Sequence, residues 1–110
     1  MNSPNEMPLV SIVMNCYNGE KYLKEAIDSI YSQTYKNWEI IFWDNASTDK
    51  SSKIAQTYDK KLKYFQASLN TKLYEARNNA LKQCDGRYVA FLDCDDVWLD
   101  HCLETQIIYA

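Results

Sequence analysis

Apolar residues fall into four short runs along the chain, separated by amphipathic stretches and polar turns. The runs at 9–14 (LVSIVM), 38–43 (WEIIFW) and 88–92 (YVAFL) predict strands, and the first is typical of a strand buried on both faces of a sheet. A weaker run at 62–67 (LKYFQA) predicts one more strand. The chain therefore carries four predicted strands of similar length.

Each strand is followed by a stretch with helical spacing. The first begins at Glu20, and its apolar positions form a stripe that would place one helix face on a core: Tyr22, Leu23, Ala26, Ile27, Ile30 and Tyr31. Three further helices are predicted: one after Ser47 that carries Ile54, Ala55 and Tyr58, one at 73–84, and one from about residue 100 onward. Asn18 and Ser47 are placed to cap the first two helices, and Gly86 to end the third in the left-handed conformation.

This alternation of strand and helix with short connections predicts an α/β fold, a parallel sheet of β-α units wound by right-handed crossovers. The length fits one domain over residues 1–110. Ligands bind at the carboxyl ends of the strands in such sheets. Polar residues follow those ends at 15–18, 44–49, 70 and 93–96, so the pattern indicates a site there.

Composition narrows the ligands that this site can take. The chain has 15 Asp and Glu against 12 Lys and Arg, a net charge of -3, which argues against a nucleic-acid partner because such partners need a basic face. It has only 2 glycines, too few for G-x-G-x-x-G or a P-loop. Any phosphate must therefore be bound without a glycine-rich loop.

The four cysteines, Cys16, Cys84, Cys94 and Cys102, form no C-x-x-C pair and follow no secretory segment. We interpret them as reduced thiols in a cytoplasmic chain, with any membrane association made through partners. Their scatter argues against a zinc site completed by His101. No apolar run approaches the roughly 20 residues of a membrane-spanning helix.

Three carboxylates, Asp93, Asp95 and Asp96, follow the last predicted strand within four positions. Like charges this close repel one another unless a cation lies among them. One interpretation is a solvated acidic turn that caps the next helix. The other is a site for Mn2+ or Mg2+, which take oxygen ligands and often complete their shell with substrate phosphates.

Other residues at this edge also have two interpretations. Asp44 and the segment 15–18 suit turn chemistry, but Tyr17 adds the aromatic face that a nucleobase pocket needs. Arg77, predicted to be partly buried on the third helix, would bind a structural carboxylate or a diphosphate. Cys94 is a poor nucleophile between carboxylates and is interpreted as a small filler.

The order and spacing of three motifs over nearly the whole chain resemble family 2 glycosyltransferases with a GT-A fold. The motifs are VSIVMNCYNGEKYLKEAIDSIYSQTYKNWEIIFWDNASTDKS from residue 10, N-x-x-x-x-x-A-R-N over 70–78 and GRYVAFLDCDD over 86–96. The chain is similar to the amino-terminal, nucleotide-sugar-binding half of such an enzyme. The resemblance thus implies a truncated, Rossmann-like GT-A sheet.

The resemblance also implies an inverting sugar transfer from a nucleotide-diphosphate donor, with a UDP-sugar expected. The acceptor would be a hydroxyl of a glycan, lipid-linked or protein acceptor in polysaccharide biosynthesis. A Mn2+ or Mg2+ ion on Asp93 and Asp95 would bridge the diphosphate. The implied nucleotide-sugar-binding residues are Cys16, Tyr17, Asn18, Asp44, Arg77, Asp93 and Cys94.

The chain departs from the family pattern at two positions and lacks one group. Lys72 stands where the family usually has glycine, and could lie over the donor pocket or clash with the usual turn. The common D-D-G-S-T-D reads D-N-A-S-T-D, which keeps Asp44 and Asp49. The general base on the acceptor hydroxyl is expected beyond residue 110, so the catalytic residue is unknown.

Two other function classes remain open. A magnesium-dependent phosphatase or receiver domain needs an aspartate directly after the first strand, where this chain has Asn15 and Asn18. A non-catalytic nucleotide-sugar-binding module, or an inactive fragment, is the stronger alternative. An incomplete sheet would also leave an apolar patch exposed, and a homodimer is expected to bury the terminal helix around Leu103 and Ile107. The residues that could form this patch are Tyr31, Trp38, Trp43, Trp98 and Ile108.

Overall fold

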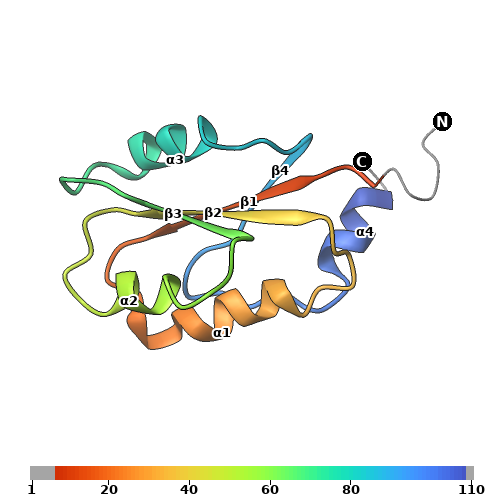
Figure 1. Ribbon diagram of the computed structural model, residues 1–110, viewed down its shortest axis with the longest axis horizontal. Helices are drawn as coiled ribbons and strands as arrows, with labels where there is room; N and C mark the ends of the chain where they lie inside the picture. Colours follow the sequence, from red (N-terminus) through yellow and green to blue (C-terminus); the bar gives the residue numbers. More distant parts are fainter. Residues whose placement is uncertain (1–6, 109–110) are drawn as a thin grey trace.

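Strands and helices alternate along the whole described chain, as Figure 1 shows. The computed structural model describes residues 7–108, with side chains up to residue 105. The elements are β1 (Val10–Cys16), α1 (Glu20–Tyr31), β2 (Trp38–Asp44), α2 (Ser51–Ala55), β3 (Leu62–Gln66), α3 (Leu73–Leu81), β4 (Tyr88–Phe91) and α4 (Cys102–Ile108). Every predicted element is present, with boundaries that differ by a few residues.

The four strands form one parallel sheet in the order β3-β2-β1-β4, which confirms the predicted α/β fold. β1 pairs with β2 over seven residues, up to Cys16 opposite Asp44. It pairs with β4 only up to Val13 opposite Phe91. β1 and β2 are central and almost wholly buried, as their apolar runs predicted. Consequently the turns that follow β1, β2 and β4 lie near one another.

Helices cover both faces of this sheet (Figure 1). On the α1 side, Leu23, Ile27 and Ile30 pack with Phe42 in the main core, and all four are fully buried. On the α3 side, a smaller core contains Val13, Ile41 and Ala80. Each buried aliphatic side chain contributes roughly 1.5–3 kcal/mol to stability. The larger core on the α1 side therefore contributes more than the smaller core on the α3 side.

Gly86 lies against β1 just before β4 begins. Its φ is not positive, so the prediction that it ends α3 in the left-handed conformation is wrong. A Cβ at this position would lie 2.5 Å from the Ser11 nitrogen and 2.8 Å from the Leu9 oxygen. The glycine is required because backbone passes directly over backbone here.

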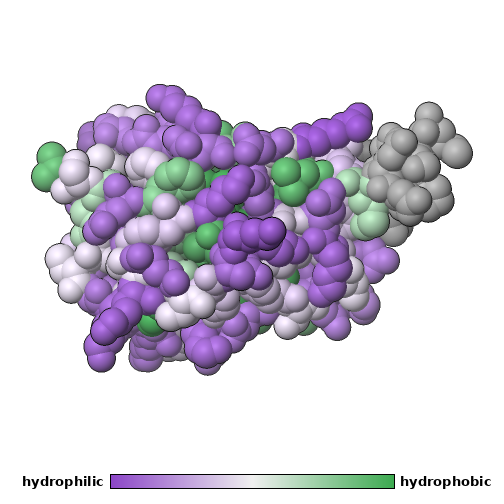
Figure 2. All heavy atoms as spheres, viewed as in Figure 1, coloured by the Kyte–Doolittle hydropathy of each residue, from purple (hydrophilic) through white to green (hydrophobic). Residues whose placement is uncertain are grey.

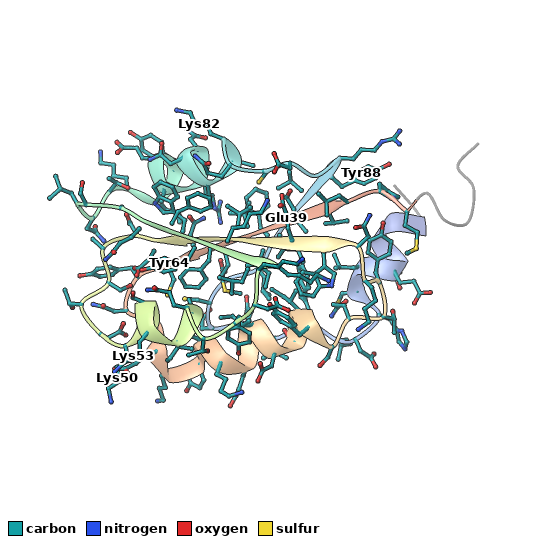
Figure 3. All side chains as sticks on the ribbon, viewed as in Figure 1. Glu39, Lys50, Lys53, Tyr64, Lys82 and Tyr88 are labelled. Carbon is teal, nitrogen blue, oxygen red and sulfur yellow. The ribbon has the colours of Figure 1, made fainter. Side chains whose placement is uncertain are left out.

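A buried carboxylate joins the strands near their amino-terminal ends, on the α3 side of the sheet (Figure 3). Glu39 is 5% exposed and accepts hydrogen bonds from Ser11 Oγ (2.6 Å), Lys63 Nζ (2.6 Å) and the Asp85 N–H (2.9 Å). Burial alone would raise the pKa of Glu39, but these hydrogen bonds outweigh it and hold the pKa below its usual value. The network ties β1, β2 and β3 to the segment before β4.

Exposed apolar side chains lie on α3, on the edge strand β4 and in the loops, among them Leu73, Phe91 and Leu99. The prediction that Trp38 and Leu103 take part in an exposed surface is wrong, since these residues are 3% and 1% exposed. Tyr31, Trp43 and Trp98 are partly buried, and the side chains of Ile107 and Ile108 lie outside the described residues. On the face shown in Figure 2, hydrophobic residues form small separate patches among hydrophilic ones. Within residues 7–108, no helix is long and apolar enough to cross a membrane.

Candidate functional site

A hollow of about 470 Å³ lies at the carboxyl-terminal edge of the sheet. The turn after β1, the first turn of α1 and the turn after β4 line it. Its lining residues are Asn15, Tyr17, Asn18, Gly19, Lys21, Tyr22, Asp93, Cys94 and Asp95. The structure therefore brings five of the predicted site residues together from two segments more than 70 positions apart.

A second hollow of about 270 Å³ shares Asn15 and Tyr17 with the first and extends to α3. The Asn15 Oδ1 atom is buried and has no hydrogen-bond partner among the described residues. The far wall is fixed by Asn45, which donates from Nδ2 to the Thr71 oxygen (2.8 Å) and accepts from the Thr71 N–H (3.0 Å). An unpaired buried acceptor costs free energy, so Asn15 offers a ligand donor a favourable partner.

Asn18 connects the turn after β1 to the loop after β2. It has a positive φ of 52°, a conformation that asparagine tolerates better than most residues. Its N–H donates to Ser47 Oγ (2.9 Å), and its Oδ1 accepts from the Thr48 N–H (2.7 Å). Asn18 and Ser47 thus bind each other's loops, and the prediction that each caps the helix following it is wrong.

One side chain from the loop after β2 and one from the first residue of α2 cap α1 instead. The Gly19 N–H donates to Ser51 Oγ (2.9 Å), and the Glu20 N–H donates to Asp49 Oδ2 (3.1 Å). Burial alone would raise the pKa of Asp49, but its hydrogen bonds with Ser51 and the Glu20 N–H lower it. The two loops at the edge of the site are thereby held as one unit.

Asp44 supports this unit from beneath the surface. Its side chain is fully buried; Oδ1 accepts from the Ser47 N–H (2.8 Å) and Oδ2 from the Tyr64 hydroxyl (2.6 Å). Burial and the Asp44 carboxylate raise the pKa of Tyr64 to about 12, so this hydroxyl remains a donor at neutral pH. Tyr64 lies on the α1 side of the sheet (Figure 3). Both carboxylate oxygens are therefore occupied within the chain.

The acidic turn after β4 fits a hard divalent cation. Asp93, Asp95 and Asp96 are all exposed, and one oxygen from each lies within 4.8 Å of the others. Oxygen-only ligands in a water-accessible turn suit Mg2+ or Mn2+, which retain open positions for phosphate oxygens. The three carboxylates can therefore hold such an ion, although exposed acidic turns without a metal are also common.

Cys16 and Cys94 lie against each other beside this turn. A hydrogen bond from Cys94 lowers the pKa of the Cys16 thiol to about 7, although burial acts in the opposite direction. The same contact, together with burial, raises the pKa of Cys94, which therefore stays a thiol. Cys94 is half-buried and acts in part as the small filler that the sequence predicted.

Arg77 does not reach the acidic hollow in this structure. The prediction that it is partly buried is wrong, because its side chain is exposed on α3 with the guanidinium 5.5 Å from the centre of the Phe91 ring. It lines a separate hollow with Leu73 and Tyr74. No carboxylate within residues 7–105 forms an ion pair with it, so a structural ion pair does not explain it either.

The two departures from the family pattern have different structural consequences. Lys72 has φ -66° and ψ 153° before α3, an ordinary extended conformation, so a lysine causes no backbone clash there. Ala46 has a positive φ of 64°, the left-handed conformation that strains any residue except glycine and a few polar ones. The alanine is the more costly departure.

Sequence reasoning did not identify three residues that shape the site. Lys21 is a cation in the wall of the larger hollow, Asn45 fixes the smaller one, and Tyr64 holds Asp44. Asn45 directly follows β2, so its position was a usable signal. Lys21 and Tyr64 sit inside a helix and a strand, where nothing in the pattern distinguishes them from ordinary surface or core residues.

Comparison with known proteins identifies relatives over almost the whole chain. A family model described as Glycosyl transferase family 2 matches residues 11–110. The Escherichia coli UDP-Glc:alpha-D-GlcNAc-diphosphoundecaprenol beta-1,3-glucosyltransferase WfgD is 41% identical over 100 residues, which cover 90% of this chain and 40% of WfgD. The chain thus spans well under half the length of this relative.

Solved structures with the same fold include two nucleotide complexes. S. aureus TarS in complex with UDP-GlcNAc superposes with a TM-score of 0.86 at 32% identity, covering 91% of this chain and 30% of that one. The mannosyltransferase PcManGT from Pyrobaculum calidifontis, in complex with GDP-Man and Mn2+, gives a TM-score of 0.78 at 26% identity, covering 86% of this chain and 30% of that one. The predicted GT-A architecture is confirmed.

Proposed function

The chain belongs to glycosyl transferase family 2, and from its geometry we propose that it carries the donor site of an enzyme that transfers a sugar from a nucleotide diphosphate. One observation carries the proposal: the turns after β1 and β4 line a single hollow that holds Tyr17 together with Asp93 and Asp95. Residues 1–110 then form the amino-terminal, donor-binding part of a GT-A domain.

The two hollows divide the donor between them. The smaller one suits the base, because it is walled by amides, a backbone turn and Tyr17, and its Asn15 Oδ1 is an unpaired acceptor among the described residues. The larger one suits the diphosphate and sugar, because it contains the acidic turn. We expect UDP as the nucleotide, by similarity to the proteins whose complexes contain UDP and UDP-GlcNAc.

Asp95 and Asp93 would hold a Mn2+ or Mg2+ ion in the larger hollow. When bound, this ion would neutralise charge on the departing diphosphate. The chain's own contribution is to fix the ligands, since Cys94 anchors the turn between them against Cys16 and Gly19. Lys21 is the cation that lines the same hollow and would offset the remaining negative charge.

Asp44 has an indirect part in this proposal. The family resemblance assigns it to the base and ribose, yet both of its oxygens are bonded inside the chain. It supports the loop that binds Asn18, and so it shapes the base pocket through the turn after β1. Because the Asp44 side chain is also fully buried, a direct bond from the nucleotide would require the loop or Tyr64 to move.

The acceptor would be a hydroxyl of a glycan, a lipid-linked or a protein acceptor, and transfer would invert the anomeric centre. The relative WfgD is named for a lipid-linked diphosphoundecaprenol acceptor, which makes lipid-linked acceptors the first class to test. The alternative is nucleotide-sugar binding without turnover. The chain spans 40% of WfgD and 30% of the TarS chain, so turnover by the whole protein is a separate test from binding by this chain.

Calorimetry of UDP binding to the chain tests the proposed donor site. We expect binding in Mn2+ to weaken at least about tenfold in EDTA and in Asp95→Asn, because the ligand set loses its charge-neutralising ion. Asp100→Asn is the matched control, an exposed aspartate outside the cluster. Equal affinity in EDTA and in Mn2+ would contradict the proposal.

A further inference from the structure

Two thiols meet at the point where the two turns of the candidate site touch. A Cβ built on Gly19 would lie 2.6 Å from Cys94 Sγ and 3.1 Å from Cys16 Sγ, so both sulfur atoms lie against the same glycine. Because these two distances share one point, the sulfur atoms lie at most 5.7 Å apart, close enough for each thiol to shift the pKa of the other.

The two cysteines lie at and beyond the ends of adjacent strands. β1 and β4 pair in parallel up to Val13 opposite Phe91. Cys16 is the last residue of β1, and Cys94 lies in the turn three residues beyond the last residue of β4. Disulfides join Cα atoms about 4.4–6.8 Å apart. The turn after β4 leaves from a strand adjacent to β1, so a disulfide would require this turn to adjust while the paired strands stay in place.

Both cysteines border hollows that a small oxidant can enter. Cys16 is 2% exposed, but it borders the 270 Å³ hollow, and Cys94 borders the 470 Å³ hollow. The lowered pKa of Cys16, to about 7, provides thiolate at neutral pH. Gly19 has no side chain, so the position that would touch both sulfur atoms holds no side-chain atom of this residue.

We propose that Cys16 and Cys94 form a redox-sensitive pair whose disulfide, formed by a hydroperoxide, weakens nucleotide binding at the donor site. The Cys16 sulfur attacks one peroxide oxygen and the O–O bond breaks, giving a sulfenic acid and water. The Cys94 sulfur then attacks the Cys16 sulfur, and the S–O bond breaks. The hydroxyl leaves as a second water with the Cys94 proton. Two thiols are oxidised by two electrons, and one hydroperoxide is reduced.

The functional consequence follows from the position of Cys94 between Asp93 and Asp95. An S–S bond of about 2.05 Å replaces a longer thiol contact, so the turn after β4 is drawn toward β1. The two candidate metal ligands flank the residue that moves, and displacements near 1 Å at such sites have large effects. This effect on affinity rests on the proposed function, whereas formation of the bond does not.

Hydrogen peroxide treatment of the chain, followed by intact mass and peptide mapping, tests the pair. We expect a loss of about 2 Da, reversed by dithiothreitol, and one cross-linked peptide that joins Cys16 to Cys94. The cross-link should persist in the double variant Cys84→Ser and Cys102→Ser and be absent in Cys94→Ser. Calorimetry with UDP and Mn2+ should show at least about fivefold weaker binding after oxidation, restored on reduction.

The outcomes separate this proposal from the donor-site proposal. Sulfinic acid at a single cysteine, or a cross-link that uses Cys84 or Cys102, would overturn the pair. A Cys16–Cys94 disulfide that leaves UDP affinity unchanged would overturn the redox effect on binding. Failure of the reduced chain to bind UDP would overturn the donor site and its redox control together, while the mass data would still decide whether the bond forms.

Discussion

Replacing Gly19 with alanine should destabilise the protein through a steric conflict with two sulfur atoms. The new Cβ would lie 2.6 Å from Cys94 Sγ and 3.1 Å from Cys16 Sγ, closer than atoms in van der Waals contact. Overpacking of this kind costs about 1–3 kcal/mol. The φ of Gly19 is -104°, which alanine adopts without strain, so backbone conformation adds little. We expect a loss of about 2 kcal/mol in the free energy of unfolding.

A double-mutant cycle separates the clash with Cys94 from the effect of losing glycine at the N-cap position before α1. In Cys94→Ala the nearest sulfur is gone, and the atom that remains at that position is Cβ at 3.4 Å. Gly19→Ala should then cost at least about 1 kcal/mol less than in the wild-type background. Urea unfolding followed by tryptophan fluorescence measures the stability with and without Gly19→Ala in three backgrounds. These are wild type, Cys94→Ala and, as the matched control, Cys84→Ala. An equal cost in all three backgrounds would refute the steric explanation.

Three further predictions concern stability. Ala46→Gly should stabilise the chain by about 0.5–1 kcal/mol, because Ala46 has φ 64°; an unchanged or lower melting temperature would contradict this. Gly86→Ala should cost about 3 kcal/mol in urea unfolding, because its Cβ would meet the Ser11 nitrogen at 2.5 Å and backbone cannot move aside; a cost below that of Gly19→Ala would count against it. Glu39→Gln should cost about 1–3 kcal/mol at pH 7. The folded-state pKa of Glu39 is lowered, so its contribution is complete above about pH 4.3 and is lost as the pH falls through the folded pKa. The difference between Glu39→Gln and wild type should therefore shrink in acid, and a constant difference from pH 7 to pH 3 would be inconsistent with this network.

The order of elements could be predicted because the buried strands of this chain consist almost entirely of apolar residues. β1 and β2 are covered on both faces, so almost every position is apolar and the runs stand out. The turn residues were harder to predict. Asn18 and Ser47 have the right chemistry for helix caps, yet each bonds to the other's loop across 29 positions. Spacing along the sequence cannot reveal which distant loop will satisfy a helix terminus.

The outline of the candidate site could be predicted from the topology of a parallel sheet. Tyr17, Asn18, Asp93, Cys94 and Asp95 meet because parallel strands place their carboxyl ends at one edge. The burial of Arg77 was predicted wrongly, because helical periodicity locates the helix but does not show which of its positions the neighbouring elements cover. The contact between Cys16 and Cys94 was missed because strand order, with β1 beside β4, was not inferred from the sequence. Side chains that act through a neighbour, such as Tyr64 on Asp44, leave no periodic signal.

A crystal of the chain grown with UDP and Mn2+, with anomalous scattering recorded at the manganese edge, tests the donor site most directly. The account predicts one strong peak at the carboxylates of Asp95 and Asp93, in contact with the diphosphate, and the uracil ring in the hollow lined by Asn15, Asn45 and Thr71. A nucleotide bound elsewhere, for example on the α2 surface around Lys50 and Lys53, or a manganese peak away from the turn after β4, would contradict it.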